Sequence, residues 1–255
     1  MPDVIEKIDS SVIRQLNDRG SVRQYRPDPV PDKMIAAVLA AACRAPSSCN
    51  QETYSIVIVR DIETRHQIRE ACGGNQPQIL EAPVFIAFCA DTRRVTHACT
   101  KYGKPFGAGI TMEMFLVSSI DTALVGMCAS LAAESLGLGT VMIGAIRNNL
   151  ITASKILGLP PKVYPVFGLC IGWPVVAPPR KPRHPLDIVV HRERYDGTGM
   201  EEGITDYDRT LADHYRSQGK PTVDHSWSQH MIKMFSESPR PDLRAELSQL
   251  GFEFR

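Results

Sequence analysis

The feature that most constrains the fold is a long apolar segment at residues 111–135, TMEMFLVSSIDTALVGMCASLAAES. It is long enough to cross a bilayer as a helix, but Glu113, Asp121 and Glu134 would each be costly in lipid. Large apolar residues lie on more than one side of this helix, so packing must cover it on most sides. The segment therefore predicts a buried helix in a soluble protein, and one domain of this size rarely covers such a helix alone.

A glycine-rich turn and a short strand follow this helix. Leu136–Gly139 is typical of a helix end, and Thr140–Ile143 is a short β-like run that stops at Gly144. The order is helix, turn, strand and glycine, whereas a dinucleotide-binding fingerprint needs a strand, a glycine turn and then a helix. These glycines therefore do not indicate a Rossmann site.

Composition excludes several classes of function. The 255 residues are 43% hydrophobic, enough for one large or two small domains, and a net charge of +1 favours no nucleic acid partner. The N-terminal residues include acidic side chains and lack a signal-peptide core, and no other stretch is suited to a membrane, so we expect a cytoplasmic protein. The seven cysteines form no CxxC pair, which indicates reduced core thiols, and the histidine spacing predicts no metal site.

The remaining pattern alternates between helices and strands. The sequence predicts helices at 4–17, 34–45, 62–71, 111–135 and up to 157, and strands at 55–59, 84–89, 140–143 and 166–171. Asp32 is the expected N-cap of the second helix, and residues 92–109 are expected to form a flexible connection. The chain is more polar after about residue 200, with short helices near 207–216, 227–235 and 240–250. We therefore expect a core at residues 1–199 and, at 200–255, an extension that wraps it or a partner subunit.

Three polar clusters lie at the ends of apolar elements, where ligands are commonly held. In RGSVR, residues 19–23, arginine forks and a serine hydroxyl suit a phosphate, although a solvated basic loop explains the same residues. In SSCN, residues 47–50, small polar groups form either a simple turn or a ligand contact. The third cluster is KPR at residues 181–183, in a stiff proline-rich segment. A GxSxG nucleophile motif and a Walker A loop are both absent from the sequence.

An ordered set of motifs resembles one family over residues 10–250. These are RGSVRQY, APSSCN, GNQ before FCAD, AAESLGLGTVMIGAIRNN, FGLCIGWP, KPRHP and a late SWS. Together they resemble the FMN-dependent nitroreductase superfamily, in the branch of the oxygen-insensitive major NADPH nitroreductase and flavin reductase P. The resemblance implies an α+β three-layer sandwich, with a central, mainly antiparallel sheet flanked by helices. It also implies an intertwined homodimer with FMN at the interface, in which the apolar helix is shared core.

The resemblance also implies roles for individual residues. It implies that one group binds the FMN phosphate and ribityl chain, namely Arg19, Ser21, Arg23, Lys181 and Arg183, with Gly20 in the same segment. It places a second group along the ring or the ribityl chain, namely Ser47, Ser48 and Asn50 across the dimer, Gln76, and the main chain of Ile143, Gly144 and Ala145. Gly20 stands where the family has a basic residue, so Arg19 would carry more of the phosphate contact. Cys49, Glu52 and Ala145 also depart from common family residues.

The implied activity is that of an FMN-dependent NAD(P)H oxidoreductase. It would reduce small-molecule acceptors such as nitroaromatics, quinones or free flavins by ping-pong two-electron transfer, without a catalytic side chain, because the flavin carries the chemistry. The alternatives are a flavin storage or delivery protein, or an enzyme of this fold with another redox reaction. In the loop before SWS, Arg216 and Lys220 are expected to hold the 2′-phosphate of NADPH, and Asp224 opposes them. A weak preference for NADPH over NADH follows, unless Arg147 or Arg240 supplies this site.

Overall fold

The computed structural model describes residues 8–106, 111–220 and 226–252. The chain forms two compact units, and each is described by itself. Unit 1 contains Met1–Pro178 and Asp242–Arg255, and unit 2 contains Pro179–Pro241. The division into 1–199 and 200–255 is an expectation about function, and it stays a prediction.

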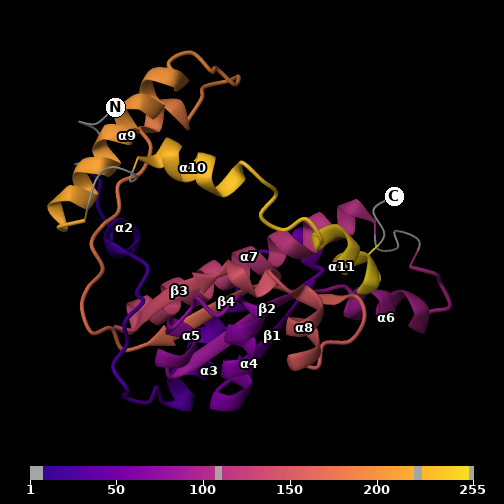
Figure 1. The fold of residues 1–255 in the computed structure, drawn as a ribbon. Helices are drawn as coiled ribbons and strands as arrows, with labels where there is room; N and C mark the ends of the chain where they lie inside the picture. The colour runs from indigo at the N-terminus through magenta and orange to yellow at the C-terminus, as the bar shows by residue number, and fades with distance from the viewer. Residues whose placement is uncertain (1–7, 107–110, 221–225, 253–255) are drawn as a thin grey trace. The chain divides into compact units, whose positions relative to one another are not determined.

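Unit 1 is built on one antiparallel sheet of four strands (Figure 1). The strands are β1 (Tyr54–Val59), β2 (Val84–Asp91), β3 (Gly139–Ile143) and β4 (Val163–Gly172). Their order across the sheet is β1-β2-β4-β3, and every neighbouring pair is antiparallel. All four strands lie where the sequence predicts them. β2 is buried along its whole length because it is a central strand covered on both faces.

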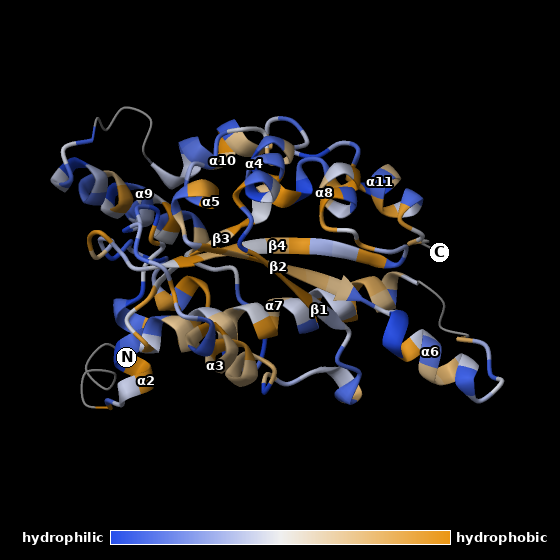
Figure 2. Ribbon diagram, turned by 90° about the horizontal axis from the view of Figure 1, so that it is seen from below, coloured by the Kyte–Doolittle hydropathy of each residue, from blue (hydrophilic) through white to orange (hydrophobic). Residues whose placement is uncertain are grey.

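Helices cover both faces of this sheet, which gives unit 1 three layers (Figure 2). One face carries α3 (Asp32–Ala42) and α7 (Met112–Ser135), and the other carries α4 (Ile62–Ala71), α5 (Gln78–Glu81), α8 (Leu150–Ile156) and α11 (Leu243–Gln249). α2 (Ser11–Asp18), α6 (Arg93–Lys101) and the 3-10 turns η1 (Ser48–Asn50) and η2 (Gly144–Arg147) complete the unit. The α+β class is confirmed.

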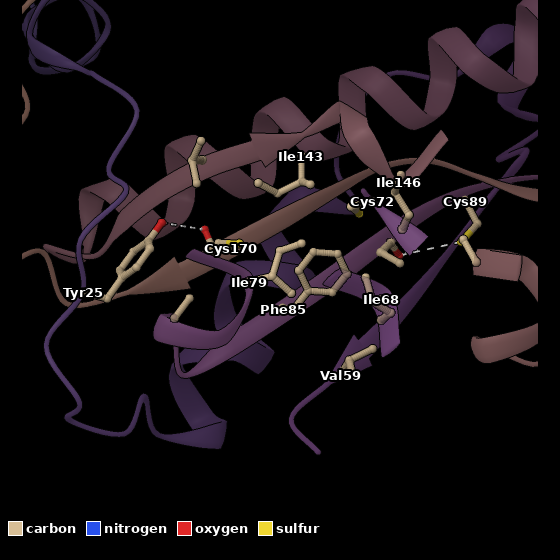
Figure 3. Packing of buried hydrophobic residues seen from close by; sticks show 14 of the residues in the cluster. Tyr25, Val59, Ile68, Cys72, Ile79, Phe85, Cys89, Ile143, Ile146 and Cys170 are labelled. Carbon is tan, nitrogen blue, oxygen red and sulfur yellow. Dashed lines mark hydrogen bonds between the residues drawn. The ribbon is translucent and has the colours of Figure 1, made fainter. Parts of the chain in front are cut away.

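The strands alternate side chains between two cores. Phe85, Ala87 and Cys89 of β2 point into the core beneath α4 and α8, which Figure 3 shows with Ile68, Ile79 and Ile146 around Phe85. Val84, Ile86 and Phe88 point to the opposite core, against α3 and α7. This period of two is the reason why one apolar strand serves both layers.

The cysteines are free, as the sequence predicts, but only some are core residues. Cys72, Cys89 and Cys170 are buried, and burial raises the pKa of the Cys72 and Cys89 thiols to about 12. These thiols stay protonated at neutral pH and are poor nucleophiles. Cys43 and Cys49 are exposed, which corrects the expectation of core thiols at these two positions.

α7 has an unusual distribution of side chains. Its inner face carries mostly small or polar residues, namely Met114, Ser118, Asp121, Thr122, Val125, Gly126, Ala129, Ser130 and Ala133. A Cβ atom on Gly126 would lie 2.2 Å from Phe167 Cζ, so glycine permits the close approach of helix and sheet. Four of its large apolar residues instead point outward: Met112, Leu116, Ile120 and Leu124 are 38–56% exposed. By length and composition alone α7 could cross a membrane, but its inner face packs on the sheet of unit 1.

Three local predictions for unit 1 are corrected. α6 (Arg93–Lys101) lies within the segment expected to be a flexible connection. Its sequence, RRVTHACTK, is mostly polar and shows no clear apolar stripe.

The N-terminus of α3 also differs from the prediction. Asp32 is the first residue of α3 and Pro31 is the cap, and Asp32 pairs with Arg60 at 2.7 Å instead of capping the helix. α2 begins after Ser10, whose hydroxyl accepts a hydrogen bond from the Ile13 amide, and residues 4–7 of the predicted helix lie outside the described residues.

In its described residues, 179–220 and 226–241, unit 2 contains the proline-rich segment and two α-helices. These are α9 (Met200–Ser217) and α10 (Trp227–Phe235), and the 3-10 turn η3 (Leu186–Ile188) precedes them. His184 packs against Tyr207 and Trp227, with ring centroids 4.0 and 4.7 Å away. The Tyr207 hydroxyl donates to the Pro182 carbonyl at 3.0 Å, which attaches the segment around Lys181 to α9.

Candidate functional site

The segment Arg19–Arg23 runs beside the start of β3. The Val22 amide donates to the Thr140 carbonyl at 2.9 Å, and the Val22 side chain is buried against Gly139. A Cβ on Gly139 would lie 2.6 Å from Val22 Cγ2, so this contact requires glycine. Because Val22 is anchored, its neighbours Ser21 and Arg23 are held at the surface, half-buried and exposed respectively. A hydroxyl donor and a guanidinium fork side by side suit an anionic group.

Arg19 is engaged differently. Its guanidinium donates to both carboxylate oxygens of Glu134, at 3.2 and 3.3 Å, and lies 3.4 Å from Ser130 Oγ. Thr140 also donates to Glu134, at 2.8 Å. The structure therefore ties Arg19 to the end of α7 and the start of β3. Its predicted phosphate contact stays a prediction, and it would have to be compatible with this ion pair.

Gly20 has a packing role that the sequence did not reveal. A Cβ at this position would lie 2.7 Å from Pro178 Cγ and 3.1 Å from Pro178 Cβ. A larger residue would therefore displace the proline ring, which gives a structural reason for the departure from the family pattern.

The turn at residues 47–52 is strained. Cys49, Asn50 and Glu52 have φ angles of 48°, 55° and 50°, in the left-handed region that non-glycine residues rarely adopt. Such residues cost on the order of 1 kcal/mol or more each and persist only when their surroundings hold them. The Ser47 hydroxyl accepts from the Glu52 amide at 3.1 Å, and the Ser48 amide donates to Asp121 of α7 at 2.9 Å. Ser48 and Asn50 are exposed, so their side chains are accessible to a ligand.

Two further elements carry predicted ring contacts. Gln76 is half-buried, and its Oε1 accepts from Gln78 Nε2 at 2.6 Å at the start of α5. β3 ends at Ile143, which is buried, and the half-buried Gly144 and Ala145 begin η2. Their main-chain groups lie at the opposite end of β3 from the Arg19–Arg23 segment.

The basic residues predicted for the nicotinamide phosphate lie in different settings. Arg147 donates to the Val166 carbonyl, and its Nη2 would lie 3.5 Å from a Cβ on Gly144. Arg240 is half-buried. In unit 2 Arg216 pairs with Asp213, and Lys220 Nζ lies 5.4 Å from the ring centroid of Tyr215. Asp224 lies outside the described residues.

Unit 2 also holds the KPR cluster. Lys181 and Arg183 are exposed, and Lys181 Nζ lies 5.4 Å from the same Tyr215 ring centroid. Arg183 Nη1 donates to the carbonyls of Lys181 and Pro182, each at 3.4 Å. Both side chains therefore present cationic ends to solvent within unit 2.

Sequence reasoning missed two residues that support these segments, Asp121 and Glu134. Both were considered only as charges that argue against a membrane span. A lone carboxylate within an apolar helix needs donors when it is buried, and that was the available signal. Among the described residues, His, Cys, Asp and Glu side chains form no group of three that could hold a metal ion.

Comparison with known proteins agrees with this architecture. Two family models match: the nitroreductase family at residues 16–173 and its C-terminal domain at residues 181–255. The oxygen-insensitive NADPH nitroreductase of Salmonella typhimurium is 36% identical, with 96% of this chain and 100% of that protein covered. The FMN reductase [NAD(P)H] of Bacillus subtilis is also 36% identical, with 96% and 98% covered.

Solved structures show the same fold. NfrA2 of B. megaterium superposes with a TM-score of 0.93 at 36% identity, covering 97% of this chain and 100% of that one. The NADPH:FMN oxidoreductase of Vibrio harveyi, solved as a complex with NAD+, gives a TM-score of 0.85 at 29% identity, covering 95% and 98%. With sequence and fold in agreement over nearly its whole length, this chain belongs to the nitroreductase family.

Proposed function

We propose that this protein is an FMN-dependent NAD(P)H oxidoreductase that reduces nitroaromatics, quinones or free flavins. The observation that carries the proposal is the placement of two accessible segments at opposite ends of β3. Ser21 and Arg23 lie beside its start, and Gly144 and Ala145 follow its end. The names of relatives covered over nearly their full length, an NADPH nitroreductase and an FMN reductase, support the same activity.

The residues present fit FMN in chemistry and spacing. Val22 is bonded to Thr140, and Gly144 comes four residues later, so β3 separates the two segments by roughly 13 Å at 3.3 Å per residue. An extended molecule with an anionic end and a flat ring suits such a spacing. Arg23 and Ser21 offer donors for the phosphate, while Gly144 and Ala145, which follow the buried Ile143, offer a half-buried main-chain surface for a ring.

The roles proposed for the side chains are binding and orientation. Ser21 and Arg23 bind the phosphate, and the family resemblance implies Lys181 and Arg183 as further cofactor-binding residues. Ser47, Ser48, Asn50 and Gln76 orient the ring and the ribityl chain. When bound, FMN supplies the two-electron chemistry, accepting reducing equivalents from the nicotinamide and passing them to the acceptor. Buried thiols such as Cys72 stay protonated, in keeping with a reaction that uses no cysteine nucleophile.

NADPH or NADH is the proposed electron donor. Arg216 and Lys220 are the proposed contacts to a 2′-phosphate, with Arg147 and Arg240 as alternatives. Arg216 already has an acidic partner in Asp213, and Arg147 is bonded to a main-chain carbonyl. Because these side chains already have partners, we propose that each contributes only modestly to binding of the 2′-phosphate. The protein would then use both NADPH and NADH.

An intertwined homodimer is the proposed assembly. The four outward aliphatic residues of α7 are spaced four apart and form one stripe along the helix: Met112, Leu116, Ile120 and Leu124. A contiguous apolar stripe of this kind marks an interaction surface. A second copy of the same chain is the proposed occupant, and it would bring the two flavin sites together at the interface.

The remaining proposals concern organisation. Residues 1–199 are proposed to form the flavin-binding core, and residues 200–255 an extension that wraps the core or the partner. A cytoplasmic location is also proposed, in keeping with the near-neutral net charge of the sequence.

The test of function is anaerobic mixing of the FMN-loaded protein with NADPH, followed by an acceptor. An oxidoreductase should lose its flavin absorbance near 450 nm within about a second, since enzymes of ordinary turnover complete cycles on that scale. A nitroaromatic or quinone should then restore it. A storage protein would keep its absorbance over minutes, which would contradict the proposal.

A further inference from the structure

Asp121 is the most completely buried carboxylate of α7, with 1% of its surface exposed. Its two carboxylate oxygens accept hydrogen bonds from Ser48 and Thr53, which are 73 and 68 residues earlier in the sequence. Oδ1 accepts from the Ser48 amide at 2.9 Å. Oδ2 accepts from the Thr53 hydroxyl at 2.9 Å and from the Thr53 amide at 3.3 Å. The carboxylate therefore bridges both ends of the segment between these two residues.

The bridged segment is the strained one. Cys49, Asn50 and Glu52 all have positive φ angles, and Ser48 and Asn50 are exposed. Left-handed backbone at non-glycine residues reverts unless its surroundings hold it. At the far end, Arg94 donates to the Glu52 carbonyl at 2.7 Å, but Arg94 is itself exposed. Asp121 is thus the buried support of this turn.

We propose that Asp121 is a positioning residue, which holds the Ser47–Glu52 turn in the conformation that faces the flavin. This inference rests on the proposed function, in which Ser47, Ser48 and Asn50 contact FMN. Asp121 is itself buried, and it acts through the turn that it holds. Ile120, the residue before Asp121 on α7, belongs to the outward stripe, so adjacent residues carry the anchor of the turn and a proposed dimer contact.

Asp121→Asn separates positioning from packing, because it keeps the volume of the side chain. A carboxylate accepts on both oxygens, whereas an amide accepts on one and donates on the other side. The variant can therefore accept from the Ser48 amide or from the Thr53 amide, but not from both, while the Thr53 hydroxyl can reverse and accept from the new amide group. Thr122→Val is the matched control, since Thr122 is equally buried on the same helix and its hydroxyl donates to the Ser118 carbonyl of α7 itself.

The experiment measures FMN binding to the apo protein by fluorescence quenching, with hydrogen exchange of a peptide covering residues 47–53 as a second readout. Asp121→Asn should raise the FMN dissociation constant about tenfold or more, equivalent to about 1.4 kcal/mol. The peptide should exchange faster in the apo variant. Thr122→Val should leave both within about twofold of wild type.

A second pair of variants decides the question if Asp121→Asn does not fold. Thr53→Val removes one donor and should weaken FMN binding by a smaller factor, and Thr53→Ser should restore it because the hydroxyl is kept. The inference is overturned if Asp121→Asn binds FMN like wild type, or if Thr122→Val loses as much affinity as Asp121→Asn. If Asp121→Asn does not fold, equal binding by the two Thr53 variants overturns it. Failure of the wild type to bind FMN would instead contradict the proposed function, on which this inference depends.

Discussion

Two of the segments proposed to contact FMN from unit 1 are held in contrasting ways. Arg19–Arg23 is attached through its own backbone, by the bond from the Val22 amide to Thr140, and it has no positive φ angle. Ser47–Glu52 has three positive φ angles, and a buried carboxylate from α7 supports it. The backbone of the first segment should therefore be less sensitive to changes in α7 than the backbone of the second.

The largest effect, loss of the proposed dimer, is expected from substitutions on α7, the helix that supports the second segment. Ile120→Asp together with Leu124→Asp should dissociate the proposed dimer. Each aliphatic side chain that the dimer buries contributes about 1.5 to 3 kcal/mol, and the two-fold symmetry doubles the loss. Sedimentation at micromolar concentration should show a monomer with little bound FMN. The exposed Arg209→Asp, in unit 2, serves as a control for added charge. A dimer that survives the double substitution would remove the outward stripe of α7 from the interface.

The second prediction concerns the ion pair between Arg19 of the first segment and Glu134 of α7. It tests whether this pair anchors the segment. Glu134→Gln should lower the free energy of unfolding by about 2 kcal/mol, because it leaves a partly buried guanidinium without its carboxylate. Side chains exposed by 21% and 12% justify a value below that of a fully buried pair. Chemical denaturation measures the change. If stability is unchanged while FMN affinity rises tenfold, the released Arg19 binds the phosphate and is a ligand rather than an anchor, and the comparison fails.

The third prediction adds a charge to the first segment at Gly20, and its expected effect is smaller. Gly20→Arg restores the basic residue of the family pattern, yet its Cβ would meet the Pro178 ring at 2.7 Å. We expect a loss of stability of about 1 to 3 kcal/mol from overpacking, with no gain in FMN affinity. Thermal unfolding and FMN titration measure the two quantities. Tighter FMN binding with unchanged stability would show that the proline moves freely and that charge at this position dominates.

The smallest expected effect concerns the nicotinamide. Lys220→Ala should lower kcat/KM for NADPH about fivefold and leave the value for NADH unchanged, since one exposed phosphate contact contributes about 1 kcal/mol. Arg209→Ala, another exposed cation of unit 2, is the matched control. A wild-type preference for NADPH above about 1000-fold, some 4 kcal/mol, would mean that another group such as Arg147 or Arg240 supplies the phosphate site.

The sequence predicted what depends on local pattern. All four strands and α7 follow from apolar runs and their glycine boundaries, and the α+β class follows with them. α6 was missed because its residues are mostly polar, and the cap of α3 was misplaced because Pro31 fixes the turn that Asp32 was expected to make. The site residues themselves come from family resemblance and stay proposals.

What the sequence could not provide is contact between distant residues. Arg19 and Glu134 are 115 positions apart, so a basic loop residue gave no sign that it was already paired. Gly20 suggested only that a charge was lost, whereas in the structure the Pro178 ring leaves no space for a side chain at this position. Asp121 suggested only a cost in lipid, whereas the structure gives it three donors from one turn. In each case a polar or small residue has a role that depends on tertiary packing.

The central claim is that Ser21 and Arg23 form the anion end of an FMN site beside β3. Titration of the apo protein with FMN tests it most directly, using Arg23→Ala against Arg26→Ala, since Arg26 is an exposed arginine of the same stretch that packs on Trp173 instead. We expect submicromolar binding by wild type, a loss of about 10- to 150-fold in Arg23→Ala from one charged hydrogen-bonding partner, and less than about threefold in Arg26→Ala. Equal affinity of Arg23→Ala and wild type, or an equal loss in the two variants, would contradict the claim.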